Sequence, residues 1–176
     1  KGKLSTFKDK VKCDHCDKFF FFNKGILSFT KIDQFYEGKF GKQVKKKSLL
    51  ENFYLKNSTF NIRFIHERFF KRFKASSPKV LDIGCGAGNP DLRLFPAEIV
   101  GVDLSLSSLN NAKETYDSVY QASINQLPFE DNSFDVVCSF DILGHIPKEE
   151  KGAVFSEIKR VLKPAGLTFH YIEVDA

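Results

Sequence analysis

Three glycines at alternate positions follow an apolar segment in the middle of the chain, and a short apolar run ending in a carboxylate comes soon after. The glycines are Gly84, Gly86 and Gly88, and the carboxylate is Asp103. Glycine has no Cβ, so a turn made of it lets backbone amides approach a ligand closely. Asp103 lies 19 residues after Gly84, near the offset of roughly 20 at which an acid meets ribose hydroxyls. The spacing indicates a site for a cofactor that carries adenosine.

The glycine spacing also separates two classes of nucleotide. The dinucleotide pattern G-x-G-x-x-G needs a sixth-position glycine, where this chain has Asn89. Asp91 then stands where the following helix would begin. A carboxylate there suits the helix dipole but competes with a pyrophosphate for the same position. A nicotinamide-dependent oxidoreductase is therefore the less favoured alternative.

The segment Val80–Asn89 resembles the first signature motif of the class I S-adenosylmethionine-dependent methyltransferases. Three further segments resemble later motifs of that family and follow in the right order: Val100–Ser105, Leu127–Val137 and Glu157–Gly166. The resemblance implies a Rossmann-like, doubly wound, mainly parallel sheet with helices on both faces. It also implies that residues 58–176 form the methyltransferase domain and that the last strands of the family's sheet are missing.

The resemblance implies the residues that hold S-adenosylmethionine. The first motif would lie against the methionine part, Asp103 would accept from both ribose hydroxyls, and Leu104 would pack on adenine. Ser123 stands where the family often has an aspartate that meets the adenine amino group, and the Ile124 amide would serve the ring. The full predicted set is Asp82, Gly84, Cys85, Gly86, Gly88, Asp103, Leu104, Ser123, Ile124, Ser139 and Phe140.

Two polar residues near the end of a predicted strand over 134–140 are candidates for facing the methyl acceptor. Asp141 follows the strand directly, and His145 lies in the next loop. Ligands of open α/β sheets bind at the carboxyl ends of the strands. His145 is a candidate base because imidazole titrates near neutral pH. A purely structural hydrogen bond of His145, close before Pro147, is the alternative.

Alternating strand and helix patterns surround these residues and predict a parallel sheet. Apolar residues at three- and four-residue steps predict a helix over 58–74, which in the family helps to close the cofactor cleft. Ser105 could cap the helix after Asp103, which would leave that acid to the ribose. The remaining expected strands cover 79–83, 99–103, 118–122, 134–140 and 167–173, and the helices cover 89–95, 106–116 and 148–163.

Charge is divided unevenly along the 176 residues. Residues 1–78 hold 19 lysines and arginines against 7 acids, whereas residues 79–176 hold 8 against 15. A basic half can bind an acidic partner such as RNA, or can simply be a solvated lysine-rich surface. Four cysteines without a disulfide-rich layout favour a cytoplasmic protein.

A pair of cysteines near the start, Cys13 and Cys16, forms half of a tetrahedral zinc site. The residues from Cys16 to Phe29 resemble the second knuckle of a small zinc ribbon, which implies that zinc is possible in a longer protein. Two free cysteines beside a phenylalanine-rich strand are the alternative, and a redox pair is less favoured. We therefore divide the chain into a zinc-ribbon-like segment over 1–30, a basic linker over 31–57 and the methyltransferase domain.

The sequence thus predicts a methyltransferase that uses S-adenosylmethionine. Its acceptor is not identified by the residues, and a small molecule is slightly favoured over RNA. The alternative is a non-catalytic module that keeps the fold and acts through its basic front segment. The oligomeric state is not predicted.

Overall fold

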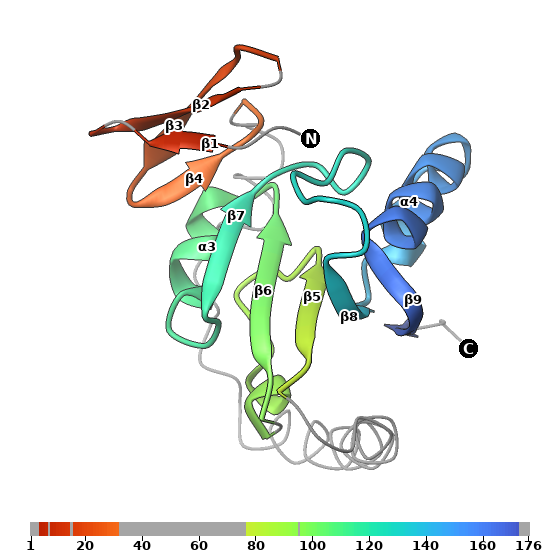
Figure 1. Cartoon of the computed structure of the whole chain (residues 1–176). Coiled ribbons are helices and arrows are strands. Elements are labelled where there is room, and N and C mark those ends of the chain that lie inside the picture. Colours follow the sequence, from red (N-terminus) through yellow and green to blue (C-terminus); the bar gives the residue numbers. More distant parts are fainter. Residues whose placement is uncertain (1–3, 7, 15, 32–76, 95, 173–176) are drawn as a thin grey trace.

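The computed structural model describes residues 4–6, 8–14, 16–31, 77–94 and 96–172. They build one nine-stranded sheet in the order β1-β2-β3-β4-β7-β6-β5-β8-β9 (Figure 1). The helix predicted over 58–74, and the basic linker apart from Lys31, lie outside the described residues. No helix in the described ranges is long and apolar enough to cross a bilayer.

Five parallel strands form the half of the sheet that carries the cofactor motifs. They are β5 (Lys79–Ile83), β6 (Glu98–Asp103), β7 (Ser118–Gln121), β8 (Phe134–Phe140) and β9 (Leu162–Tyr171). Each pairs with its neighbours in parallel register. The predicted strands are confirmed, except that β9 begins five residues earlier than expected. Its register shifts where Leu162 faces Phe134 but Leu167 faces Val136, so the extra residues bulge out of the ladder.

One helix covers each face of this half (Figure 1). Helix α3 (Leu106–Ala112) packs against β6 and β7, and α4 (Lys148–Val161) packs near β9. The structure confirms the predicted doubly wound class. Helix α3 is shorter than expected because the chain leaves it in tight turns and buries Tyr116 in the core. A 3-10 turn, η1 (Pro90–Leu94), replaces the helix expected over 89–95.

Alternation along the strands builds a core layer on each face of the sheet. Val80 points toward α3 and packs with Leu109, whereas Leu81 points toward α4 and packs with Val154. These side chains are almost completely buried. Helix α4 buries the side chains of Val154, Ile158 and Val161.

The first four strands extend the sheet beyond β7. They are β1 (Leu4–Thr6), β2 (Lys10–Cys13), β3 (Phe19–Asn23) and β4 (Ile26–Ser28), and they pair antiparallel in chain order. Strand β4 then pairs in parallel with β7, and Ile26 is buried in the α3 layer. The segment predicted as a separate zinc-ribbon-like unit therefore continues the main sheet, while the three domain boundaries stay a prediction.

Candidate functional site

A cavity of about 450 Å³ opens at the carboxyl ends of β5, β6, β7 and β8. This volume lies in the range of pockets that bind small molecules and cofactors. Its walls come from the glycine turn, the ends of the strands and the start of α4. The lining residues are Gly84, Gly86, Asp103, Leu104, Ser123, Ile124, Asn125, Phe140, Asp141, Ile142, His145, Ile146, Pro147 and Glu150.

The glycine turn adopts backbone conformations that other residues rarely adopt. Gly84, Gly86 and Gly88 all have positive φ, at 67°, 53° and 91°. A Cβ at Gly84 would meet Ile142 Cγ1 at 2.6 Å, whereas a Cβ at Gly86 would meet nothing within 4 Å. Glycine at position 84 is therefore needed for close packing against the loop after β8. At position 86 the backbone lies open to the cavity, as a cradle for a ligand requires.

Asp103 joins the turn to the end of β6. Its Oδ2 accepts a 2.8 Å hydrogen bond from the Gly86 amide, and its Oδ1 accepts one of 2.8 Å from the Ser105 amide. Ser105 caps α3 by accepting from the Ser108 amide. The cap is thus made by Ser105, as the sequence suggested, and the Asp103 carboxylate faces the cavity.

Behind the turn, Asp82 is a buried carboxylate. The Tyr116 hydroxyl donates to Asp82 Oδ2 at 2.6 Å and accepts from the Asn89 amide at 2.7 Å. Among the described residues, Asp82 Oδ1 has no hydrogen-bond partner. Burial raises the pKa of Asp82 to about 7, against the lowering effect of the Tyr116 hydrogen bond. Asp82 does not line the cavity in this structure, but it holds an unused acceptor directly behind the turn.

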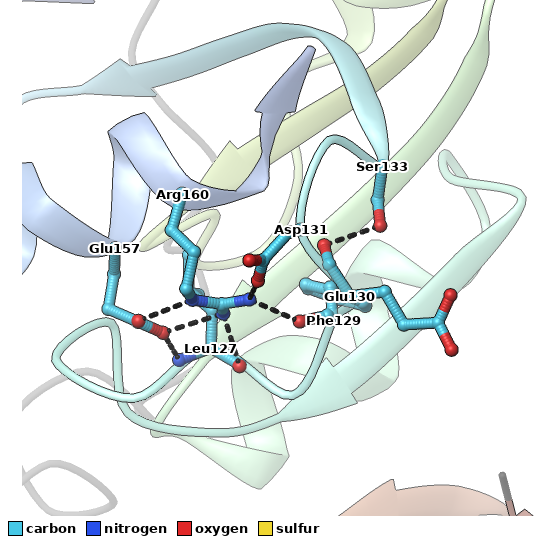
Figure 2. A network of polar contacts seen from close by, with 7 residues as sticks. All are labelled: Leu127, Phe129, Glu130, Asp131, Ser133, Glu157 and Arg160. Atoms are coloured by element: carbon cyan, nitrogen blue, oxygen red, sulfur yellow. Dashed lines mark hydrogen bonds and ion pairs between the residues drawn. The ribbon is translucent and has the colours of Figure 1, made fainter. Parts of the chain in front are cut away.

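The wall formed by residues 123–131 is fastened to α4 (Figure 2). Arg160 donates from Nη2 to the Leu127 carbonyl at 3.0 Å and from Nη1 to the Phe129 carbonyl at 2.8 Å. Glu157 accepts from the Leu127 amide at 2.6 Å and pairs with Arg160 in a two-pronged contact. Ser123 and Ile124 precede this clamp on the cavity wall, so α4 fixes the position of the predicted adenine contacts.

The two candidate acceptor-facing residues lie together at the other side of the cavity. Asp141 Oδ2 is 3.8 Å from His145 Nε2, and both side chains are partly exposed. Asp141 has φ of 57°, an uncommon conformation for a residue with a side chain, and its amide donates to the Tyr171 carbonyl. Strain of this kind is concentrated at functional sites.

The structure brings most of the predicted residues to one place. Gly84, Gly86, Asp103, Leu104, Ser123, Ile124, Phe140, Asp141 and His145 line the cavity, whereas Asp82, Cys85, Gly88 and Ser139 do not. Ser139 is fully buried and shares a 2.8 Å hydrogen bond with His170 Nδ1. Burial raises the pKa of the Cys85 thiol well above its ordinary value. The ligand roles of all these residues stay predictions.

Sequence reasoning missed five lining residues: Asn125, Ile142, Ile146, Pro147 and Glu150. The Glu150 carboxylate accepts from the Asn125 side-chain amide at the cavity wall. The apolar residues Ile142, Leu143 and Ile146 after Asp141 could have been a signal, because apolar side chains in a loop at the carboxyl end of a strand must pack against a neighbouring surface.

The predicted zinc half-site lies in strands β1 to β4, the antiparallel part of the sheet that we call the small sheet. Cys13 is buried at the end of β2, and Cys16 is exposed in the turn that follows. In the part of the chain that the structure describes, no three His, Cys, Asp or Glu side chains gather as a metal-binding group. Zinc binding therefore stays a prediction without support from these residues.

A doubly wound sheet with a glycine cradle and an acid at the end of its second parallel strand defines a Rossmann-like, nucleoside-binding class of domain. A protein-family model described as "Methyltransferase domain" matches residues 81–170, slightly more than half of the chain. This chain belongs to that family.

Relatives and solved structures agree with this assignment. The chain is 36% identical over 104 residues to a 24-methylenesterol C-methyltransferase 2 of Arabidopsis thaliana, a match that covers 53% of this chain and 28% of that protein. It is 34% identical over 122 residues to squalene methyltransferase 1 of Botryococcus braunii, covering 62% and 32%. The crystal structure of the PH0226 protein from Pyrococcus horikoshii has a TM-score of 0.55 and 27% identity, covering 78% and 66%. The matches thus span about three tenths of the length of these two curated relatives.

Proposed function

We propose that this protein transfers a methyl group from S-adenosylmethionine to a small, neutral and largely apolar acceptor. The observation that carries the proposal is that Asp103 and the glycine turn line the same cavity as Asp141 and His145. Cofactor groups and acceptor-facing groups can therefore meet within one pocket. Family membership and this open pocket favour an enzyme over a non-catalytic module.

The cavity residues fit a sulfonium nucleoside. Each Asp103 oxygen already accepts one amide hydrogen, and its second lone pair can accept a ribose hydroxyl. Ser123 and the Ile124 amide would meet adenine, and the orphan oxygen of Asp82 can accept from a ligand ammonium after a small opening of the turn. When bound, the cofactor supplies a methyl group that is already activated by its positive sulfur.

The acceptor side of the cavity combines the Asp141–His145 pair with an apolar surface. Ile142, Ile146 and Pro147 form that surface, and the described lining contains no lysine or arginine. An anionic acceptor would find no lysine or arginine to pair with there, whereas a neutral apolar molecule would gain free energy by leaving water. The matched relatives are named for sterol and squalene, which are neutral and largely apolar molecules. This wall therefore favours a lipid-like acceptor over RNA.

The reaction would be an in-line displacement in which positioning does most of the work. An electron pair of the acceptor forms a bond to the methyl carbon while the carbon–sulfur bond breaks and its electrons stay on sulfur, which gives S-adenosylhomocysteine. His145 would take the proton that leaves the methylated acceptor, and Asp141 would orient the imidazole. Holding donor and acceptor in one pocket supplies the near-attack geometry.

Calorimetry with S-adenosylmethionine and S-adenosylhomocysteine tests the cofactor half of the proposal. We expect binding by the 176-residue chain and a loss of affinity of roughly 100-fold or more in Asp103→Ala, because two charge-assisted hydrogen bonds disappear. The matched control is Glu149→Ala, an acid in the first turn of α4 that does not line the cavity. Absence of binding by a folded wild-type chain, or equal losses in both variants, would contradict the proposal.

A further inference from the structure

One end of the small sheet combines exposed aromatic side chains with lysines. Because β1 to β4 run antiparallel, the turn after β1 and the turn after β3 lie at the same end of the sheet. Lys8 comes from the first turn and Lys24 from the second, and Lys10 faces Phe21 across the β2–β3 ladder. With the neighbouring Phe22, these residues define what we call the Lys-Phe end.

The aromatic side chains of this end are exposed on both faces of the sheet. Phe21 is 56% exposed and Phe22 is 43% exposed. Consecutive residues of a strand point to opposite faces, so Phe21 and Phe22 are exposed on opposite faces of the sheet. Leu4 and Phe19, at the opposite end of the same strands, are exposed as well, so four of the six large exposed apolar side chains of the described residues lie on β1 and β3. Such clustering marks an interaction site rather than ordinary surface.

Positive charge gathers at the same end. Lys113, at the end of α3, reaches across and donates to the Lys24 carbonyl at 2.6 Å, which brings a further ammonium group to the turn after β3. Asp9 is the acid in the described part of these turns.

The other acids of the small sheet are elsewhere. Asp14 and Asp17 lie in the turn at the opposite end, where Asp17 pairs with Lys12 at 2.7 Å. The Lys-Phe end is therefore both apolar and cationic.

We infer that the Lys-Phe end docks the protein on an anionic lipid surface. Peripheral attachment generally takes two signals, an apolar element that enters the interface and a basic patch that meets anionic headgroups. Phe21 and Phe22 supply the first signal, and the lysines supply the second. Lys10 Nζ lies 4.4 Å from the centre of the Phe19 ring, two residues further from the turns along β3, so Lys8 and Lys24 supply the charge nearest the turns.

Single-stranded nucleic acid is the rival partner for aromatic and basic side chains. Bases stack on aromatic rings presented by one face of a sheet. Exposure of Phe21 and Phe22 on opposite faces instead suits immersion of the whole end in an apolar medium. The inference goes beyond the proposed function and is independent of it, because it concerns attachment rather than the cofactor cavity.

Vesicle sedimentation with the 176-residue chain tests this inference. The vesicles contain either phosphatidylcholine alone or phosphatidylcholine and phosphatidylserine in equal parts. We expect binding to the anionic vesicles, weakening with added salt, and little binding to the neutral ones. The double change Phe21→Ser and Phe22→Ser should lower the partition coefficient about tenfold or more. Lys8→Gln and Lys24→Gln should each lower it about fivefold.

Matched controls lie on α4, which packs near β9, the edge strand farthest from β1 (Figure 1). Phe155→Ser removes an aromatic side chain that is 50% exposed, and Lys159→Gln removes an exposed lysine. Both should leave vesicle binding unchanged. The inference is overturned if the wild-type chain ignores anionic vesicles, if the controls lose binding equally, or if the Lys-Phe variants lose only binding of a labelled single-stranded RNA. Circular dichroism and cofactor calorimetry confirm that each variant is folded, independently of the vesicle result.

Discussion

Tyr116 and Asp82 form a buried hydrogen bond of 2.6 Å that links the end of α3 to the strand entering the glycine turn. Because the same hydroxyl accepts from the Asn89 amide, one phenol fixes both sides of the turn. The partnership leaves one carboxylate oxygen of Asp82 without a partner among the described residues. Asp82 is therefore costly to ionise, and its charge makes the stability of the domain depend on pH.

Asp82→Asn should stabilise the cofactor-free protein at high pH. The ordinary pKa of 3.8 rises to about 7 in the folded state. A raised carboxyl pKa means that the folded state holds the proton more tightly, so stability falls as pH rises from about 4 to about 7. Asparagine removes that loss while still accepting from Tyr116. We expect a gain of about 3–4 kcal/mol at about pH 8 and little difference at about pH 4. Urea unfolding at both pH values measures it, and a gain that does not vary with pH would contradict this reading.

Tyr116→Phe should destabilise the turn by about 1–3 kcal/mol, because the Asn89 amide and the Asp82 carboxylate lose their shared buried partner. The loss should grow with pH, since the deprived carboxylate becomes still harder to ionise. Thermal or urea unfolding at several pH values measures both effects. Tyr120→Phe is a suitable control, because among the described residues no hydrogen bond joins the Tyr120 hydroxyl to the turn. Equal losses in the two variants would argue against a role for this hydrogen bond.

Arg160→Lys should weaken cofactor binding although Arg160 does not line the cavity. Lysine cannot reproduce the fork that holds two carbonyls and Glu157 at once. The wall that carries Ser123 and Ile124 would loosen, and we expect the Kd of S-adenosylhomocysteine to rise roughly 5–30-fold.

Arg93→Lys provides the matched control for Arg160. Arg93 also bonds a carbonyl and a carboxylate, those of Thr115 and Asp117, but it does not line the cavity or hold its wall. Calorimetry should show unchanged affinity in this variant. If both arginine variants weaken binding equally, the effect reflects general stability and not the position of the wall.

Gly84→Ala should destabilise the protein by more than about 2 kcal/mol, because it combines a positive φ with a collision against Ile142. Adding Ile142→Ala should recover the part due to the collision and leave the backbone cost of about 1–2 kcal/mol. Gly152→Ala in α4 is the control, since a Cβ there meets nothing and should stabilise by about 0.5–1 kcal/mol. Chemical unfolding of the wild type, Gly84→Ala, Ile142→Ala and the double variant completes the cycle. Failure of the double variant to recover any stability would exclude Ile142 as the obstacle.

The half of the sheet that carries the motifs could be predicted from local patterns of residues. Strong apolar runs bounded by glycines are local signals, and they predicted β5, β6 and β8, the Ser105 cap and the helix that begins at Lys148. The spacing from Gly84 to Asp103 could be counted along the chain, because a strand, a turn and a second strand bring these two residues together within one unit.

Which side chains share the cavity and which lie behind it depends on contacts between distant parts of the chain. Asp82 and Ser139 come from the same strand ends as the lining residues, yet Tyr116 and His170 turn them into buried hydrogen-bond partners. Several cavity contacts join residues that are far apart in sequence. They are those of Glu150 with Asn125, of Ile142 with Gly84, and of Arg160 with the Leu127 and Phe129 carbonyls. The pairing of β4 with β7 is likewise a long-range contact. Such contacts depend on how the two faces of the sheet are covered, and no local pattern of residues encodes that arrangement.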